Sequence, residues 1–316
     1  WSPEVFNCNA PDTGNMEVFM NYATKAQQDR WLQPLLAGDI RSSYAMTEPQ
    51  VASSDATNVE MSIVRDGDAW VLNGRKWFIT GAMNERTKIL IVMGKSDPSN
   101  ASRHLQQTQV LVPKDTAGLT LVRPLSTFGY DDAPIGHAEL IFENCRVPLD
   151  NVLLGEGRGF EIAQGRLGPG RMHHCMRLIG TGQRALELAC KRAVSRSTFG
   201  RKLSKHQSVR EDISRMFSEI EMARLLVLKT CYKIDEKGVA ASIDMIAATK
   251  TTIPLLIQNV IDRAMQMHGA GGLTADYCMA EGFNYARWCR QADGPDQVHQ
   301  MSLGKQIIER YSGEKA

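Results

Sequence analysis

Residues 44–55, Tyr-Ala-Met-Thr-Glu-Pro-Gln-Val-Ala-Ser-Ser-Asp, lie where the sequence changes from a helical to a β pattern. Before them, Ala26–Leu36 carries apolar residues at helical spacing, and Gly38 ends that segment. After them, short β-rich runs separated by turn residues continue to about residue 154. We therefore expect residues 1–43 to be the tail of a helical domain and residues 44–154 to form a β domain.

The β segment has no helices between its strands, which favours a sheet or barrel over a parallel βαβ sheet. Trp70–Leu72 and Trp77–Thr80 flank Asn73-Gly74, a dipeptide typical of two-residue hairpin turns. We therefore predict a hairpin at that dipeptide. The other expected strands are Lys88–Met93, Thr108–Val112, Val122–Pro124 and Glu139–Phe142.

Residues 155–316 read as helical, which makes the fold class α+β. Gly155–Phe160 contains glycines spaced as in a dinucleotide-binding loop, but no strand precedes it, so we expect a flexible entry to a helix. Pro254 should kink the third long helix. Long helices with short links predict a C-terminal four-helix bundle. The expected helices are Phe160–Val194, Gln207–Glu236, Ala240–His268, Ala275–Gln291 and Val298–Tyr311.

The composition of the 316 residues is that of an ordinary globular protein, with 43% hydrophobic and 23% charged residues. A net charge of +2 without a basic run gives no support for a nucleic-acid partner. Seven cysteines without a CxxC pair indicate free thiols in a reducing compartment and no metal site. No apolar run reaches the ~18–20 residues of a membrane span. The chain begins at Trp1, so we expect a preceding segment, with any targeting signal, to be missing.

Three segments together resemble the acyl-CoA dehydrogenase superfamily: residues 44–55, Trp77–Gly81 (Trp-Phe-Ile-Thr-Gly) and Gln266–Gly272 (Gln-Met-His-Gly-Ala-Gly-Gly). The family hallmarks are a T-E-P-x-x-(A/G)-S-D loop, a W-I-T strand and a Q-x-x-G-G-x-G turn. Family members 10 and 11 are more similar, in A-M-T-E-P-x-V-A-S-S-D-A-T-N, G-P-G-R-x-H-H-C-M-R and A-D-G-P-D-x-V-H. The resemblance extends to about Tyr311 and implies that most of the N-terminal helical domain is absent.

The resemblance implies an FAD cofactor and assigns residues of the β domain to it. Met46 and Thr47 would contact the flavin edge, and Ser54 would meet the pyrophosphate. Phe78 and Thr80 would flank the ring, for which an aromatic face and a hydroxyl are suitable groups. Without the family context, Trp77 and Phe78 would simply be on alternate sides of a strand.

The family binds each FAD between two subunits, and an R-x-T-F-G stretch of the partner corresponds to Arg196 and Thr198 here. A guanidinium pairs well with a pyrophosphate. The other residues expected at the nucleotide are Gln266, Gly269, Gly272 and Gln297. The local alternatives are a solvated charge for Arg196, a helix C-cap for the glycines and a polar first-turn residue for Gln297.

The family reaction removes an α-proton and a β-hydride, and most members take the proton with the Glu of a Y-E-G motif. The matching tripeptide is Ala292-Asp293-Gly294, so Asp293 is the expected base and Gly294 a substrate-binding residue. Asp-Gly-Pro is also strong turn chemistry, and Asp296 is a competing carboxylate that we expect to be exposed. Some members place the base on the first long helix, where this chain has Gly170, which excludes that alternative.

Arg171 matches a substrate-pocket arginine that would bind CoA or orient the loop of Asp293. His173 and His174 follow it on a helix, and neighbours there point to different faces, so at most one can face a pocket. We therefore expect no paired metal site at these histidines. The loop of Gln50–Ser53, one residue longer than the common form, and Ala292 in place of Tyr leave the acyl-chain preference open.

The leading interpretation is an FAD-dependent acyl-CoA dehydrogenase of lipid β-oxidation that forms a trans-2-enoyl-CoA and reduces an electron-transfer flavoprotein. An acyl-CoA oxidase and a non-catalytic scaffold or binding protein of the same fold are the alternatives. The resemblance also implies a homotetramer, built as a dimer of dimers. An intracellular compartment is expected, with the mitochondrial matrix ahead of the peroxisome or the bacterial cytoplasm.

Overall fold

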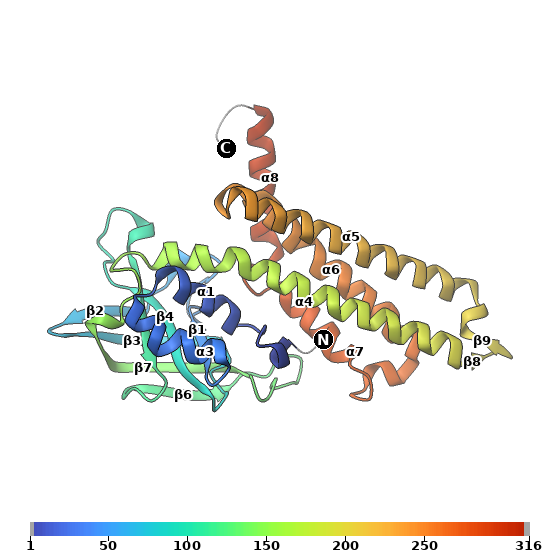
Figure 1. Cartoon of the computed structure of the whole chain (residues 1–316), viewed down its shortest axis with the longest axis horizontal. Helices are drawn as coiled ribbons and strands as arrows, with labels where there is room; N and C mark the ends of the chain where they lie inside the picture. Colours follow the sequence, from blue (N-terminus) through green and yellow to red (C-terminus); the bar gives the residue numbers. More distant parts are fainter. Residues whose placement is uncertain (1–2, 313–316) are drawn as a thin grey trace. The chain divides into compact units, whose positions relative to one another are not determined.

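A computed structural model describes residues 3–312, which divide into two units, residues 3–167 and residues 168–312 (Figure 1). The extreme ends of the first and last predicted domains, residues 1–2 and 313–316, lie outside the described residues. The predicted domain limits after residues 43 and 154 stay predictions. An α+β architecture, with a sheet followed by helices, is confirmed.

The unit of residues 3–167 begins with helices α1 (Asp12–Tyr22), α2 (Lys25–Gln27) and α3 (Gln33–Ala37). Thr24 caps α2 through a hydrogen bond that its side chain accepts from the Gln27 amide. Gly38 ends α3 in a left-handed conformation (φ 77°), as a glycine after a helix commonly does. The sequence therefore marked the end of this helical stretch correctly.

The helices are followed by a seven-stranded sheet in the order β1-β4-β2-β3-β7-β6, with β5 paired to β4. β1 pairs with β4 in parallel and β2 touches β4 in parallel, while the remaining pairs are antiparallel. The strands are β1 (Arg41–Ala45), β2 (Ser62–Asp66), β3 (Ala69–Thr80), β4 (Thr87–Lys95), β5 (Gln107–Pro113), β6 (Leu119–Pro124) and β7 (His137–Pro148).

Both faces of β4 are buried, and its alternate residues belong to two different cores. Ile89 and Ile91 pack with the α1 residue Phe19, on the face that the helices cover (Figure 1). Leu90 and Val92 pack with the strands on the opposite face. Successive strand residues point to opposite faces, so a run of consecutive apolar residues here indicates burial on both sides.

The predicted hairpin at Asn73-Gly74 is wrong, because β3 runs unbroken through that dipeptide. The turn is instead at Gly67-Asp68, since Asp66 of β2 pairs directly with Ala69 of β3. At Gly74 the strand has a bulge, with φ 152°, and a Cβ there would lie 2.8 Å from the Met61 Cγ. A bulge that needs glycine and a turn that needs glycine give the same local signal.

The unit of residues 168–312 contains most of α4 (Gly159–Ser195), then α5 (Gln207–Lys237), α6 (Ile243–His268), α7 (Met279–Cys289) and α8 (Asp296–Ser312). A short hairpin, β8 (Ser197–Thr198) and β9 (Arg201–Lys202), follows α4 (Figure 1). One apolar core joins Leu178 of α4, Ile220 of α5 and Ile257 of α6. Helix α6 is continuous through Pro254, and the predicted kink stays a prediction.

Within the described residues, the segment Ala240–Leu273 is long and apolar enough to span a membrane by length and composition. This is weak support for a span, because α6 provides much of the bundle core and core helices have the same composition.

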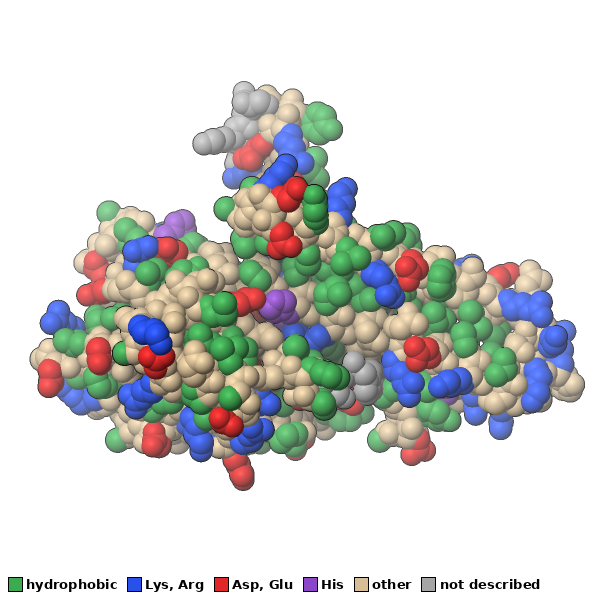
Figure 2. Space-filling model, viewed as in Figure 1, with side chains coloured by type: hydrophobic (Ala, Val, Ile, Leu, Met, Phe, Trp, Pro, Cys, Tyr) green, Lys and Arg blue, Asp and Glu red, His purple; other side chains and the backbone are tan. Residues whose placement is uncertain are grey.

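Helix α5 carries an exposed apolar stripe on the face turned away from the core. Figure 2 shows hydrophobic side chains gathered along this part of the helical unit. An exposed stripe of this kind marks an interaction surface, and we call it the α5 apolar face. It consists of Phe217, Met222, Leu225, Leu228 and Tyr232.

Candidate active site

Asp293 lies in the loop between α7 and α8, and its backbone is held in the left-handed region (φ 56°). Its carbonyl oxygen accepts a hydrogen bond from the Arg171 Nε at 2.9 Å. The His299 Nε2 lies 3.2 Å from the same oxygen and donates to it, since a carbonyl only accepts. Aspartate tolerates this conformation better than most residues. Two side chains, from α4 and α8, therefore fix a strained loop residue.

The carboxylate of Asp293 faces α4. Its Oδ2 lies 3.3 Å from the His174 Nε2, and a Cβ built on Gly170 would lie 3.4 Å from the same oxygen. Gly170 and His174 are four residues apart and so share one helix face. Positions 170 and 293, the two positions at which family members could carry the base, therefore lie next to each other. In this chain, Asp293 supplies the carboxylate.

The histidines beside Asp293 are held neutral. Burial lowers the pKa of His299 to about 4, and the charges of Arg171 and Lys250 act in the same direction. Burial also lowers the pKa of His174, against the opposing effect of Asp293. The pKa of Arg171 is lowered by burial as well, but a guanidinium stays charged. Near neutral pH, the positive charge closest to the Asp293 backbone therefore comes from Arg171.

Gly294 is fixed by its conformation and by its neighbour. It has φ 104°, and a Cβ at this position would lie 2.8 Å from the His299 Nε2. We expect Gly294→Ala to lower the free energy of unfolding by about 1–3 kcal/mol, because it combines backbone strain with a clash. A urea titration measures this change.

The matched control is Gly304→Ala on α8, where a Cβ would meet nothing within 4 Å. This change should be neutral or should stabilise by up to about 1 kcal/mol, since alanine favours a helix. Equal stabilities of the two variants would show that the Gly294 conformation is not required.

The expectation that Asp296 is exposed is wrong. Asp296 is 6% exposed, and its Oδ2 accepts a hydrogen bond from the Arg290 Nε at 2.7 Å. Arg290 also donates to the Gln258 Oε1 at 3.3 Å. Asp296 starts α8, where a carboxylate is favoured by the helix dipole. Arg290 therefore balances the charge of Asp296, which makes Asp296 a poor candidate for a base.

The residues predicted for the flavin edge and ring come together between β1 and β3. The Trp77 amide donates to the Thr47 carbonyl at 3.0 Å. Met46 and Thr47 directly follow β1, and Thr80 ends β3 with its hydroxyl 3.0 Å from the His137 Nδ1. Ser54 lies in the exposed part of the loop after them.

Phe78 does not continue a regular strand. It has φ 52°, and the β3–β7 register shifts between Lys76 and Ile79. Trp77 and Phe78 have ring centroids 4.9 Å apart in an edge-on arrangement. The simple alternative of two residues on opposite strand faces is therefore incorrect, and the Phe78 side chain is left 39% exposed.

A buried ion pair fixes the loop that follows Met46. The Lys76 Nζ donates to the Glu48 Oε1 and to the Met46 carbonyl, both at 2.7 Å. The side chains of Glu48 and Lys76 are both 0% exposed. Glu48 also accepts from the amides of Glu60 and Met61, at 2.7 and 3.0 Å. Burial lowers the pKa of Lys76 to about 8, against the opposing charge of Glu48. Glu48 belongs to the Thr-Glu-Pro motif, but nothing in the local sequence predicts this buried pairing.

The predicted nucleotide residues of the helical unit are spread along it. Arg196 and Thr198 lie just beyond α4, next to Phe199, which is 99% exposed. Gln297 is exposed in the first turn of α8. At 1.5 Å per residue, the 25 residues from Arg171 to Arg196 correspond to about 37 Å. On one chain, Arg196 is therefore remote from Asp293.

The turn after α6 carries the other predicted nucleotide residues. Gly269 (φ 62°) follows the last helical residue, and Gln266 is exposed one turn before it. Gly272 is buried, and a Cβ there would lie 2.5 Å from the Met265 carbonyl oxygen. These glycines end the helix. A glycine can end a helix and also let a nucleotide approach its backbone, so the predicted cofactor role remains compatible with this geometry.

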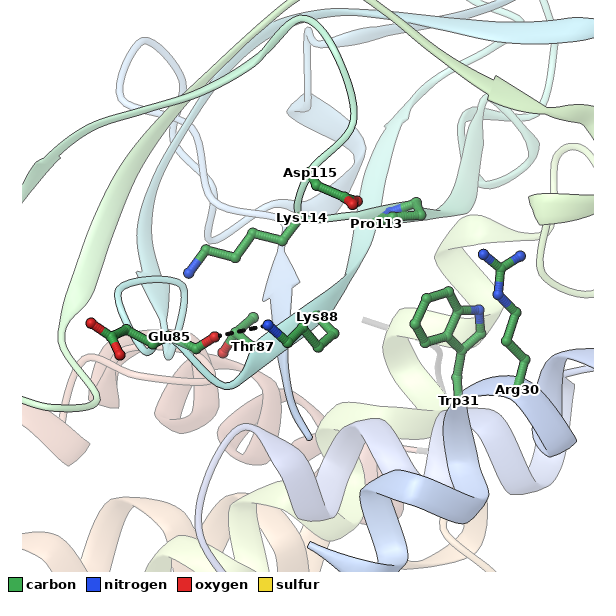
Figure 3. A pocket seen from close by; sticks show the side chains of 8 residues that line it. All are labelled: Arg30, Trp31, Glu85, Thr87, Lys88, Pro113, Lys114 and Asp115. Carbon is green, nitrogen blue, oxygen red and sulfur yellow. Dashed lines mark hydrogen bonds between the residues drawn. The ribbon is translucent and has the colours of Figure 1, made fainter. Parts of the chain in front are cut away.

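A cavity of about 550 Å³ in the unit of residues 3–167 does not contain any predicted site residue. Figure 3 shows Trp31 and Arg30 on one side of it and Lys114 on the other, with Lys88 bonded to the Glu85 carbonyl. The lysines are long and partly solvated, and none is held in a buried polar network. We therefore place the candidate chemistry at Asp293 and not in this cavity.

The chain matches two known protein-family models over most of the described residues. The middle domain of acyl-CoA dehydrogenase matches residues 43–145, and the C-terminal domain matches residues 157–308. Mouse acyl-CoA dehydrogenase family member 10 is 52% identical over 99% of this chain, which spans 29% of the mouse protein's length. The predicted likeness to family members 10 and 11 is confirmed.

Solved structures show the same relationship. One from Mycobacterium abscessus, assigned to the acyl-CoA dehydrogenases, is 47% identical with a TM-score of 0.95, covering 98% of this chain and 76% of that one. A glutaryl-CoA dehydrogenase from Mycobacterium smegmatis, solved with FADH2, is 24% identical with a TM-score of 0.83 over 96% and 73% of the two chains, and it shows the fold alone. On its domain matches and its identity to these relatives, the chain belongs to the acyl-CoA dehydrogenase family.

Proposed function

We propose that the protein is an FAD-dependent acyl-CoA dehydrogenase that converts an acyl-CoA thioester to the trans-2-enoyl-CoA. The observation that carries the proposal is the Asp293 carboxylate, held on a pinned loop opposite Gly170. When bound, FAD supplies the hydride acceptor. Asp293 takes the α-proton on a carboxylate oxygen, as a general base must lie within reach of the proton it removes.

The residues present fit a flavin. Phe78 offers an exposed aromatic side chain at a left-handed position in β3. Thr47, after β1, and Thr80, at the end of β3, add hydroxyls. Met46 follows β1 beside Thr47, and Ser54 is exposed on the next loop, where a pyrophosphate can reach it. A flat apolar ring with one polar edge needs this combination of groups.

The chain's own residues orient the base and the substrate. Arg171 and His299 hold the Asp293 carbonyl, so the carboxylate turns toward α4. Gly294 directly follows Asp293, and its lack of a side chain lets the His299 ring pack closely against its backbone. We assign Arg171 and Gly294 to the substrate region on this basis.

A second subunit completes the FAD site in this proposal. Arg196 is about 37 Å from Arg171 on the same chain, and Thr198 lies two residues further on. Both residues would therefore contact an FAD that is bound mainly by the partner subunit. Gln266, Gly269, Gly272 and Gln297 would meet the nucleotide as well. The α5 apolar face gives the helical unit a surface for packing against another copy, which supports a dimer of dimers.

Arg196→Ala should reduce the fraction of protein that retains FAD by at least about threefold, because a bidentate charge-assisted contact to the pyrophosphate is lost. The ratio of flavin to protein absorbance after gel filtration measures retention. Lys191→Ala, which removes an exposed charge five residues earlier, within α4, is the control and should retain FAD. Full occupancy in Arg196→Ala would mean that Arg196 is a solvated surface charge.

An electron-transfer flavoprotein is the proposed acceptor, and the mitochondrial matrix the proposed compartment. An acyl-CoA oxidase would instead give hydrogen peroxide on turnover in air. A scaffold would bind acyl-CoA without reducing its flavin. The presence of Asp293 in a pinned loop favours an enzyme over a scaffold.

The experiment that tests the function is a flavin spectrum of the purified full-length protein during anaerobic titration with acyl-CoAs of several lengths. Bleaching by one class of acyl-CoA would support a dehydrogenase and identify its substrate. Flavin bands that no acyl-CoA bleaches would contradict the dehydrogenase and favour the scaffold. A protein that binds no flavin would contradict the proposed cofactor.

A further inference from the structure

His174 is a buried residue of α4 whose ring packs against α7, and both of its ring nitrogens have partners. The Nε2 lies 3.3 Å from the Asp293 Oδ2. The Nδ1 lies 3.1 Å from the Arg177 Nη2 and 3.1 Å from the Tyr285 hydroxyl. The imidazole is therefore a bridge between an arginine and the carboxylate of the candidate base.

The partners determine the tautomer of His174. A guanidinium has only N–H donors, so the Nδ1 that faces Arg177 must be an acceptor. The proton of the neutral ring is then on Nε2, where it is donated to the Asp293 carboxylate. Arg177 is itself fixed by a hydrogen bond from its Nε to the Tyr285 hydroxyl at 3.2 Å.

Burial lowers the pKa of His174 and keeps the ring neutral. Arg177 on α4 and Lys250 on α6 both oppose a positive charge on it, while Asp293 favours one. Lys250 is fully buried and donates to the Cys289 carbonyl, and the Cys289 Sγ lies 3.8 Å from the His174 Nδ1. A neutral donor thus faces Asp293 across the physiological pH range.

We propose that His174 is a positioning residue for Asp293, and that Arg177 fixes the His174 tautomer so that Nε2–H orients the carboxylate toward its substrate. This inference rests on the proposed function, since it gives Asp293 the role of base. A hydrogen bond to a carboxylate stabilises its charged form. The donor therefore keeps Asp293 ionised and ready to accept a proton at lower pH.

The test compares His174→Leu with His174→Gln in the FAD-loaded full-length protein. Leu removes the donor, whereas the Gln side-chain amide can still donate from near the Nε2 position. The rate of flavin reduction by saturating acyl-CoA is measured against pH. For His174→Leu we expect a rate of flavin reduction about 10-fold to 100-fold lower at pH 7. The acidic limb of the pH–rate profile, where the rate falls because the base is protonated, should move to higher pH by about one unit. His174→Gln should stay within about threefold of the wild type.

Arg177→Met gives a second variant that leaves the imidazole in place. Without the guanidinium, the Nδ1 can take the proton, so the ring can lose its donor toward Asp293. The acidic limb should move in the same direction as in His174→Leu, by a smaller amount. Acyl-CoA affinity and FAD content should remain unchanged in all three variants. A rate loss without movement of the acidic limb would overturn the proposal in favour of a packing role.

A stability measurement separates failure of this inference from failure of the proposed function. The unfolding midpoints of His174→Leu, Asp293→Ala and the double variant should be non-additive if the two side chains bond, because alanine removes the acceptor of the His174 Nε2–H. Additive midpoints would overturn the inference whatever the activity. Non-additive midpoints with normal flavin reduction in Asp293→Asn would remove Asp293 as the base, and the proposal with it.

Discussion

Asp293→Asn lowers the rate of flavin reduction by acyl-CoA by about 10³-fold to 10⁴-fold and leaves FAD bound, because an amide of the same shape cannot accept the α-proton. The loop should persist, since Arg171 and His299 bind the Asp293 carbonyl and not its side chain. Anaerobic stopped-flow absorbance measures the reduction, and the flavin-to-protein absorbance ratio measures cofactor content.

Two further variants make this result specific. Asp296→Asn removes the negative charge that pairs with Arg290, so it should lower stability while flavin reduction continues. Gly170→Glu in the Asp293→Asn background should return part of the rate of flavin reduction, because a side chain at position 170 would lie next to the Asp293 carboxylate position. Fast reduction by Asp293→Asn alone would refute the assignment.

Lys76→Met should destabilise the protein by about 3–5 kcal/mol, because it leaves the charge of Glu48 buried without its partner. FAD should be lost as well, since Lys76 also holds the Met46 carbonyl at the start of the loop proposed to contact the flavin. Thermal unfolding and flavin content after gel filtration measure the two effects.

The control for this prediction is Lys88→Met, which removes an exposed lysine from β4 and should change stability by no more than about 0.5 kcal/mol. Adding Glu48→Gln to Lys76→Met should recover part of the loss, because no unpaired charge then remains buried. A Lys76→Met protein of wild-type stability would show that the pair is open to solvent.

The sequence predicted what depends on local periodicity. Helices α4 and α5 follow their apolar spacing to within a residue or two of the predicted ends. Gly38 was interpreted correctly because a glycine after a helix has one common role. Asn73-Gly74 was not, because the choice between a turn and a bulge depends on the strands that pair on either side.

The parts of the candidate site that were missed depend on tertiary contacts. Nothing local marks Lys76 as the partner of Glu48, which is 28 residues away in the chain. The exposure of Asp296 was misjudged because Arg290 and Gln258 surround it only in the folded unit. Of the two adjacent histidines, the structure was needed to decide that His174 faces Asp293.

The unbroken course of α4 restricts how its gene segment can change. Arg171 and Arg196 are placed by one continuous helix and the residue that follows it, so each added residue would rotate everything beyond it by about 100° and advance it by about 1.5 Å. Substitutions leave this spacing intact, whereas a one-residue insertion would turn the apolar side of α4 out of the bundle. We therefore expect homologous sequences to accumulate length differences in the β8–β9 hairpin or the loops, and to have no gaps between these two arginines.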